Sequence, residues 1–121
     1  ASKAVQYVLK KMGIEFKVVS RDAERGDLTY EQLTADTIQE HHLIINATPV
    51  GTAPNIEEAP ALDYSAIGEK HQLFDLVYNP ATTEFLKRGE AQGANTMNGI
   101  LMLQTQAIAS WHIWQRELNI E

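Results

Sequence analysis

The chain contains no cysteine, so it forms neither a disulfide bond nor a thiolate zinc site, and this is compatible with a reducing cytoplasm. Basic residues are also scarce, and the formal net charge of -6 leaves no basic field to hold a nucleic-acid backbone. No apolar run approaches the ~20 residues that span a bilayer. The sequence also does not begin with the charged segment followed by an apolar segment that is typical of a signal peptide. We therefore expect a soluble, cytoplasmic protein with no nucleic-acid or membrane partner.

One apolar run is the most informative feature of the 121 residues, whose ordinary composition predicts one domain with one core. Leu43-Ile44-Ile45 passes abruptly into Asn46 and then into small and polar residues. Strands that are covered on both faces read as continuous apolar runs, and open α/β sheets bind ligands beyond the carboxyl ends of such strands. The run therefore predicts a buried parallel strand that ends at a binding site.

Apolar periodicity and turn residues divide the chain into alternating helices and strands. Ser2 can cap the first helix and Gly13 can stop it, while Pro80 halts a strand because proline cannot donate to a ladder. This order predicts an α/β protein with a doubly wound, mostly parallel sheet. The predicted elements are a helix over 1–12, a strand over 15–20, helical turns within 29–41, a strand over 43–47, a long surface loop over 52–69 with a weakly helical part at 64–67, a strand over 72–78, a helix over 82–92, a short strand over 94–97 and a helix over 99–118.

The chain opens on a helix, whereas a doubly wound domain places its first helix after a central first strand. We therefore expect residues 1–121 to be a partial domain that lacks its first strand and the following turn. The absence of a central strand would leave unpaired edges on the strands over 15–20 and 43–47, and such edges invite pairing with another chain. We expect either association between copies or a rearranged sheet.

Polar clusters follow three of the predicted strands. In a parallel sheet such clusters converge on one edge, and the N-terminus of the first helix beside them would be ready to hold an anion, as a nucleotide site requires. Alternatively, asparagine and threonine simply begin turns and satisfy backbone groups there. The clusters are Ser20-Arg21, Asn46-Ala47-Thr48 and Tyr78-Asn79.

Arg21 and Arg25 lie in the turn after the first visible strand, where a dinucleotide-binding fold meets the adenosine ribose. Arginine accommodates a 2′-phosphate through bidentate charge-assisted bonds, which favours NADP over NAD. Asp22 between them could instead point at a ribose hydroxyl, and Glu24 could pair with either arginine on the surface.

Other polar residues favour structural roles. The four histidines show no metal-ligand spacing, so we predict no metal site and expect most of them on the surface. Asp75 lies inside an apolar strand, where a carboxylate is costly unless it is hydrogen-bonded. We expect it to anchor the Asn79-Pro80 turn or to order the cleft.

Three separated motifs occur in order along the chain: residues 44–51, then residues 74–80 with Thr83 and Phe85-Leu86, then residues 98–107. They resemble the carboxy-terminal half of the shikimate dehydrogenase family over nearly the whole chain, and Ala1 to Ala4 looks like the end of that family's glycine-rich turn. The resemblance implies a Rossmann-like NADP-binding domain. It also implies a parent enzyme that reduces 3-dehydroshikimate to shikimate in aromatic amino-acid biosynthesis.

The resemblance assigns residues to the cofactor, position by position. Ser20 and Arg21 match the family pair that holds the adenosine ribose and its 2′-phosphate, and Arg25 matches a second basic position. Asp22 replaces a common threonine, and its negative charge keeps NAD as the less favoured alternative. The remaining cofactor positions are Ala47, Thr48 and Pro49 along the cofactor, Leu76 and Val77 beside the nicotinamide ribose, and Gly99 and Met102 at the nicotinamide.

Tyr78 and Gln106 match the two residues through which this domain reaches the substrate. Met102 and Gln106 are four residues apart, so they share one face of the last predicted helix. Without the resemblance, Met102 would be interpreted as core filler and Gln106 as a solvent-facing helix former.

The resemblance also places the catalytic lysine and aspartate in an amino-terminal domain, so no residue of this chain is assigned as catalytic. We therefore expect the isolated chain to be inactive. Two alternatives remain: a member of the same family that acts on quinate with NAD, and a non-catalytic nucleotide-binding or interaction module.

Overall fold

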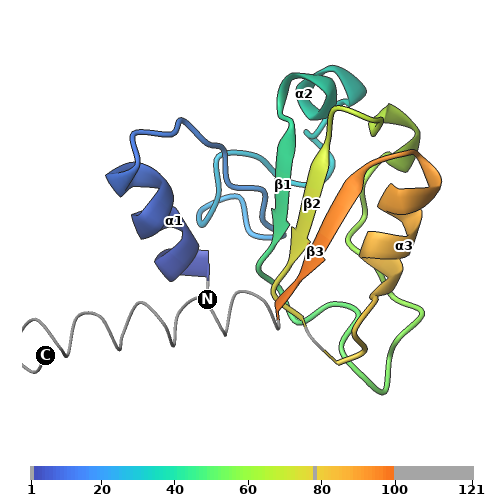
Figure 1. The fold of residues 1–121 in the computed structure, drawn as a ribbon. Coiled ribbons are helices and arrows are strands. Elements are labelled where there is room, and N and C mark those ends of the chain that lie inside the picture. The colour runs from blue at the N-terminus through green and yellow to red at the C-terminus, as the bar shows by residue number, and fades with distance from the viewer. Residues whose placement is uncertain (1, 78, 100–121) are drawn as a thin grey trace, which may run out of the picture.

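The computed structural model describes residues 2–77 and 79–99, and a three-stranded parallel sheet forms its centre (Figure 1). The strands lie in the order β1-β2-β3, with Ile45 opposite Phe74 and Phe74 opposite Met97. The sheet and its connecting helices form the Rossmann-like α/β fold that the sequence predicts. The strands are β1 (Leu43–Asn46), β2 (Gln72–Asp75) and β3 (Asn95–Asn98), and the helices are α1 (Ser2–Lys11), α2 (Ala35–Glu40), the 3-10 helix η1 (Tyr64–Ala66) and α3 (Glu84–Ala91).

One hydrophobic core joins the sheet to α2, η1 and α3. Leu73 of β2 is 1% exposed, and Phe85 and Leu86 of α3 pack into the same cluster. The Thr83 hydroxyl caps α3 by accepting from the Leu86 N–H, and Gly93, at φ +91°, ends it as predicted. The buried members of this core are Ile38, Ala66, Ile67, Leu73, Phe85, Leu86 and Ala94.

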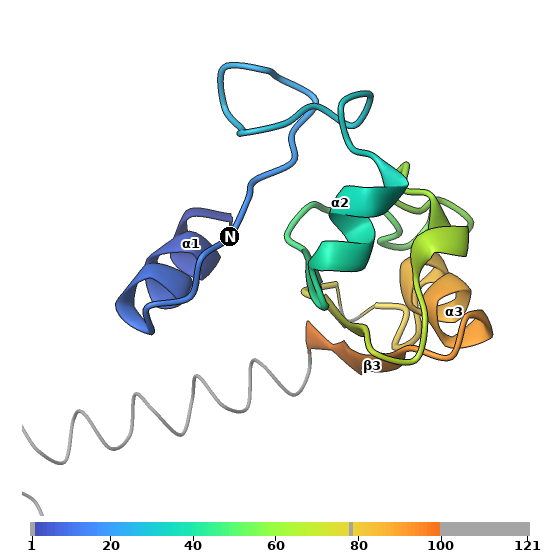
Figure 2. The same cartoon turned by 90° about the horizontal axis from the view of Figure 1, so that it is seen from above.

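Helix α1 forms as predicted and ends before Gly13, which has a φ of +72°. Figure 2 shows that α1 lies away from α2, α3 and the sheet. Tyr7 and Val8 are exposed at 63% and 51%, as is Met12 just after the helix at 67%, whereas Val5 and Leu9 are partly buried. The described residues therefore leave much of the apolar surface of this helix uncovered.

The predicted strand over 15–20 is wrong. This segment forms a single bridge, between Val19 and Leu28, and is not part of the sheet. The Val18 N–H donates to the Asp27 carboxylate at 2.8 Å, and the Val18 carbonyl accepts from the Asp27 N–H at 2.8 Å. A strand needs a ladder partner, and among the described residues β1 pairs with β2 alone, so residues 15–20 bond instead to their own loop.

The other boundaries lie close to the predicted ones. β2 ends at Asp75, three residues early, and β3 is shifted by one residue. The long loop contains the expected weak helix as η1 but also contributes Ala66 and Ile67 to the core. The helix predicted over 99–118 lies outside the described residues except for Gly99.

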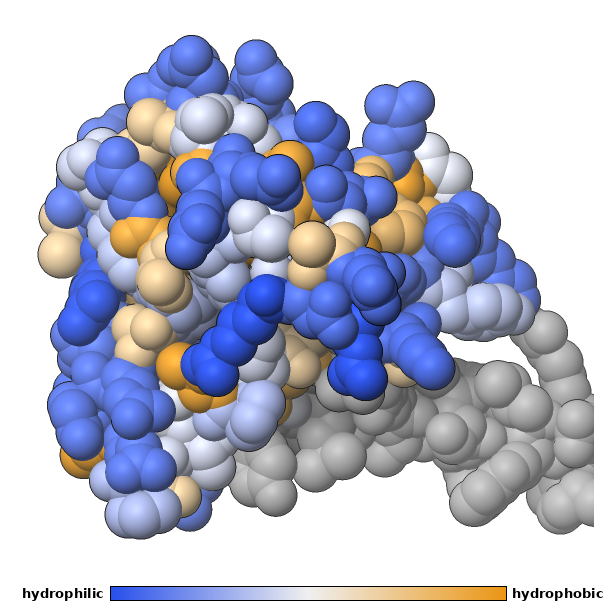
Figure 3. All heavy atoms as spheres, turned by 180° about the vertical axis from the view of Figure 1, so that it is seen from behind, coloured by the Kyte–Doolittle hydropathy of each residue, from blue (hydrophilic) through white to orange (hydrophobic). Residues whose placement is uncertain are grey.

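The surface is mixed. Seen from behind, polar residues cover most of the face that Figure 3 shows, with apolar patches scattered between them. Within residues 2–77 and 79–99, no helix has the length and apolar character needed to cross a membrane.

Candidate functional site

Buried polar side chains meet where β1 and β2 end. The register places Asn46 directly opposite Asp75, and these residues are 4% and 0% exposed. The Asn46 Nδ2 donates to Asp75 Oδ1 at 3.1 Å, and the Leu76 N–H donates to the Asn46 carbonyl at 3.1 Å. Asn46 of the second predicted polar cluster therefore meets Asp75, whereas the convergence of Tyr78-Asn79 on this place stays a prediction, because Tyr78 lies outside the described residues.

The loop after β1 wraps around the Asn46 amide. Asn46 Oδ1 accepts from the Thr48 N–H at 3.1 Å and from Thr48 Oγ1 at 2.6 Å, and Nδ2 also donates to the Val50 carbonyl at 3.3 Å. The Val50 N–H in turn donates to Thr48 Oγ1 at 3.2 Å. One buried side chain thus fixes residues 47–50, which include the predicted cofactor residues Ala47, Thr48 and Pro49.

Asp75 fixes the segment after β2. Its Oδ1 accepts from the Val77 N–H at 3.0 Å, and its Oδ2 accepts from Thr83 Oγ1 at 2.6 Å. Burial raises the pKa of the Asp75 carboxyl, and the hydrogen bonds from Thr83, Val77 and Asn46 oppose that rise. The expectation that this carboxylate is hydrogen-bonded is confirmed, and its role in the Asn79-Pro80 turn or the cleft stays a prediction.

The contact of Thr83 with Asp75 is the feature of this site that sequence reasoning missed. Thr83 is 0% exposed and joins Asp75 to the start of α3. The sequence pattern that could have predicted this contact is a carboxylate inside an apolar strand, Asp75, followed eight residues later by a threonine at the start of a helix. Such a pair offers a buried acceptor and a hydroxyl donor that can satisfy each other.

Gly99 brings the third strand to the same place. Its N–H donates to the Val77 carbonyl at 3.4 Å, and a Cβ at Gly99 would lie 2.7 Å from the Leu76 carbonyl carbon. Only glycine therefore permits this approach of β3 to the end of β2. Leu76, Val77 and Gly99 therefore lie together, whereas Tyr78, Met102 and Gln106 lie outside the described residues.

The predicted adenosine-binding residues share one tight turn. The Asp22 N–H donates to the Ser20 hydroxyl at 3.2 Å, and the Asp22 carboxylate accepts from the Glu24 N–H at 2.9 Å. Asp22 Oδ2 also lies 3.6 Å from Arg25 Nε, in an exposed ion pair. Asp22, and not Glu24, is therefore the partner of Arg25.

Because residues 15–20 form no strand, the sheet does not carry Ser20 and Arg21 to the ends of β1 and β2. The cause is the same missing ladder partner that prevents the strand itself. The convergence of this turn with the strand ends stays a prediction.

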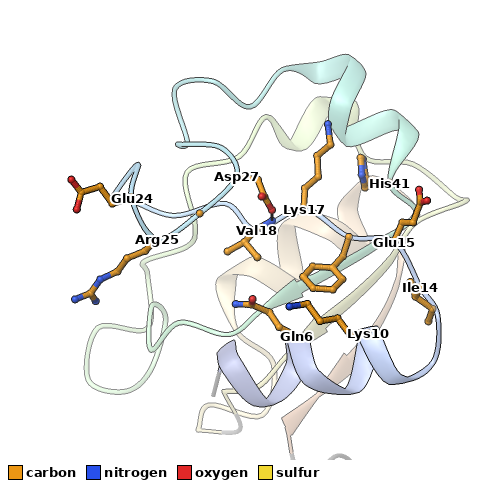
Figure 4. A pocket seen from close by; sticks show the side chains of 12 residues that line it. Gln6, Lys10, Ile14, Glu15, Lys17, Val18, Glu24, Arg25, Asp27 and His41 are labelled. Carbon is orange, nitrogen blue, oxygen red and sulfur yellow. Dashed lines mark hydrogen bonds between the residues drawn. The ribbon is translucent and has the colours of Figure 1, made fainter.

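A pocket of about 650 Å³ lies between α1 and the segment that follows it (Figure 4). Of the predicted site residues that the structure describes, only Arg25 lines it, and that side chain is 83% exposed. Charges of both signs surround the pocket, so it shows no clear preference for an anion. Its charged lining residues are Lys10, Lys17 and Arg25 against Glu15, Glu24 and Asp27.

His71 is a buried exception among the histidines, most of which are expected on the surface, because it is 4% exposed. Its Nδ1 accepts from the Gly68 N–H at 3.0 Å, and its Nε2 lies 2.8 Å from the Ile38 carbonyl. Within the described ranges, no group of three histidine or acidic side chains is arranged to hold a metal ion.

Comparisons with known proteins point to one family, although no protein-family model matches the chain. The curated shikimate dehydrogenase (NADP(+)) of Carboxydothermus hydrogenoformans is 30% identical over 128 residues, covering 94% of this chain and 46% of that protein. The crystal structure of Thermus thermophilus shikimate 5-dehydrogenase with NADP(H) and shikimate is similar with a TM-score of 0.75 and 29% identity, covering 92% of this chain and 44% of that chain.

A third similar protein was crystallised with a different nucleotide. Shikimate 5-dehydrogenase from Listeria monocytogenes, in complex with shikimate and NAD, matches with a TM-score of 0.65 and 28% identity, covering 78% of this chain and 35% of that chain. The chain spans about half the length of the curated relatives that it matches over most of its own length.

Proposed function

Because the chain belongs to the shikimate dehydrogenase family, we propose that it is the nucleotide-binding half of an oxidoreductase that reduces 3-dehydroshikimate to shikimate with NADPH. The observation that carries this proposal is the site at the ends of β1 and β2. There, buried hydrogen bonds hold residues 47–50, Val77 and Gly99 at the sheet edge where open α/β sheets bind ligands. Residues 1–121 then form part of a single NADP-binding domain, and an amino-terminal domain supplies the catalytic groups.

The turn over 20–25 supports NADP over NAD. Asp22 is already paired with Arg25, whereas Arg21 forms no ion pair with any described residue. The negative charge that would repel a 2′-phosphate is therefore offset within the turn, and Arg21 is left to bind the phosphate. Ser20 accompanies Arg21 at the adenosine ribose.

The rest of the cofactor follows the ends of β1, β2 and β3 in this proposal. When bound, the nicotinamide carries the hydride, and the residues of this chain orient it against the substrate carbonyl. Tyr78 and Gln106 contact the substrate. The cofactor contacts beyond the adenosine ribose are Ala47, Thr48, Pro49, Leu76, Val77, Gly99 and Met102.

Arg21→Ala tests the nucleotide assignment. Loss of one charge-assisted hydrogen bond is worth about 1.5–3 kcal/mol, so we expect NADP+ affinity to fall tenfold or more while NAD+ affinity changes little. Calorimetric titration of both nucleotides measures this. Lys87→Ala, which removes an exposed positive charge from α3, is the matched control. Equal losses for the two nucleotides refute the role of Arg21.

Catalysis needs the other half of the enzyme. We expect the purified chain to be inactive and a chimera that joins it to the amino-terminal half of the Thermus thermophilus relative to oxidise shikimate with NADP+. Activity of the chain alone would overturn the first expectation. A chimera that prefers quinate and NAD+ would favour the alternative substrate, and a chain without nucleotide affinity would favour an interaction module.

The outer edge of β1 supports association between copies. The His42 and Asn46 carbonyls accept from β2, and because ladder bonds alternate along a strand, the backbone groups of Leu43 and Ile45 face the other way. Leu43 is 48% exposed, so the edge is accessible to a second chain. We also propose a cytoplasmic location, which the absence of cysteine supports.

Sedimentation tests this association. Leu43→Pro removes an outward N–H at the first residue of the strand, where proline is tolerated, and should give monomers. Leu43→Ala keeps the N–H and should still associate. A wild-type chain that sediments as a monomer at all concentrations contradicts the proposal.

A further inference from the structure

Two segments of the proposed cofactor site are connected through one buried carboxylate. The Asn46 side chain is hydrogen-bonded to Thr48 and Val50, and its Nδ2 also donates to Asp75 Oδ1. The same Oδ1 accepts from the Val77 N–H, in the segment after β2. A single oxygen atom, on a side chain that is 0% exposed, therefore bonds to both segments, in addition to the backbone bond between the Leu76 N–H and the Asn46 carbonyl.

Chemistry determines the direction of the bonds at Asn46 and at Asp75 Oδ1. A backbone N–H can only donate, so the Thr48 N–H fixes Asn46 Oδ1 as the atom that faces it. Nδ2 must then face Asp75, and the Val77 N–H also donates there, so Asp75 Oδ1 must be an unprotonated acceptor. This arrangement satisfies the Thr48 and Val77 N–H groups and the Asn46 Nδ2 donor together.

The second carboxylate oxygen ties the network to a rigid element. Thr83 Oγ1 donates to Asp75 Oδ2 at 2.6 Å and accepts from the Leu86 N–H at 3.4 Å, inside the first turn of α3. Within the described part of the chain, no buried side-chain nitrogen or oxygen lacks a partner. A fully satisfied polar network of this kind rigidifies the backbone around it.

We propose that Asp75 is a positioning residue, which holds residues 47–50 and Leu76-Val77 in one common geometry for the nicotinamide half of the cofactor. Its part in cofactor binding rests on the proposed function. Asp75 does not touch the reacting atoms. It acts through Asn46, Val77 and Thr83, and the two segments should loosen together when it is removed.

Hydrogen exchange measures this coupling in the full chain without any ligand. In Asp75→Ala, we expect the Thr48, Val50 and Val77 amides to exchange together at least tenfold faster, while the Ile38 amide, bonded to the Thr34 carbonyl, changes little. In Asp75→Asn, the amide oxygen keeps both Oδ1 bonds and the amide nitrogen donates to Thr83, so exchange stays within about twofold of wild type. Asp63→Asn, at an exposed helix cap, is the charge-matched control.

A second variant keeps the test decisive if Asp75→Ala does not fold. Thr83→Val removes only the donor to Asp75 Oδ2 and should accelerate the same amides to a smaller extent, and Thr83→Ser should restore them. Faster exchange in one segment alone, equal acceleration at Ile38, or an Asp75→Asn variant as impaired as Asp75→Ala overturns the proposal.

Nucleotide titration distinguishes a failure of the positioning role of Asp75 from a failure of the proposed nucleotide site. We expect the Kd for NADP+ to rise about tenfold in Asp75→Ala and less than threefold in Asp75→Asn. Affinity unchanged in Asp75→Ala overturns the positioning role. A wild-type chain that binds no NADP+ refutes the proposed nucleotide site and the cofactor part of the inference, while the exchange data still report on the coupling.

Discussion

Replacing Gly99 by alanine tests whether close approach of β3 to the end of β2 shapes the site. The new Cβ would lie 2.7 Å from the Leu76 carbonyl carbon and closer still to its oxygen, whereas real Cβ contacts are essentially never under 3.0 Å. The obstacle is backbone, so no side-chain rotation relieves it. Either Gly99 or the Leu76-Val77 segment must move, and the 3.4 Å bond between the Gly99 N–H and the Val77 carbonyl is lost.

Overpacking of this kind lowers the free energy of unfolding by about 1–3 kcal/mol. Alanine also reduces the conformational entropy of the unfolded chain, which raises the free energy of unfolding by about 0.5–1 kcal/mol. We expect Gly99→Ala to lower the free energy of unfolding by about 1–2 kcal/mol, or the melting temperature by about 4–8 °C, and to weaken NADP+ binding. Gly68→Ala is the control, because nothing lies within 4 Å of its Cβ position. Thermal melts in which the two variants behave alike would refute the reasoning.

Two further predictions concern the core and its buried charge. Leu73→Ala should lower the free energy of unfolding by about 2–5 kcal/mol in urea titrations, because Leu73 is 1% exposed at the centre of the core, and a loss below 1 kcal/mol would contradict that placement. Burial raises the pKa of Asp75, so the folded chain retains a proton that the unfolded chain has already released. The free energy of unfolding should therefore fall as pH rises through the folded pKa, by at most about 1.4 kcal/mol per pH unit, and Asp75→Asn should remove this slope; an unchanged slope counts against it.

Local signals explain why much of the fold could be predicted. The continuous apolar run that begins at Leu43 predicts a strand covered on both faces. It forms β1, but Leu43 is 48% exposed and only Asn46 of this strand is fully buried. Gly13 and Gly93 end their helices because glycine adopts positive φ at little cost. These features depend on neighbouring residues, so the sequence displays them directly.

The failures have a different physical origin. Residues 15–20 carry β-prone side chains, but a strand exists only when another strand pairs with it, and no local pattern reports that partner. The Asp75–Thr83 contact and the burial of His71 likewise depend on how β2, α2 and α3 pack. Of the candidate site, the strand ends could be predicted, but the hydrogen bonds that hold them could not.

The exposed apolar face of α1 has a consequence for how the chain folds. An isolated helix of ten residues is marginal in water, because nucleation is costly and most helical stability comes from packing. Tyr7, Val8 and Met12 receive little such packing from the described residues. Helix α1 is therefore the described element whose helicity depends most on contacts outside the sheet. The temperature at which α1 loses its helicity would show whether another protein surface packs against Tyr7, Val8 and Met12.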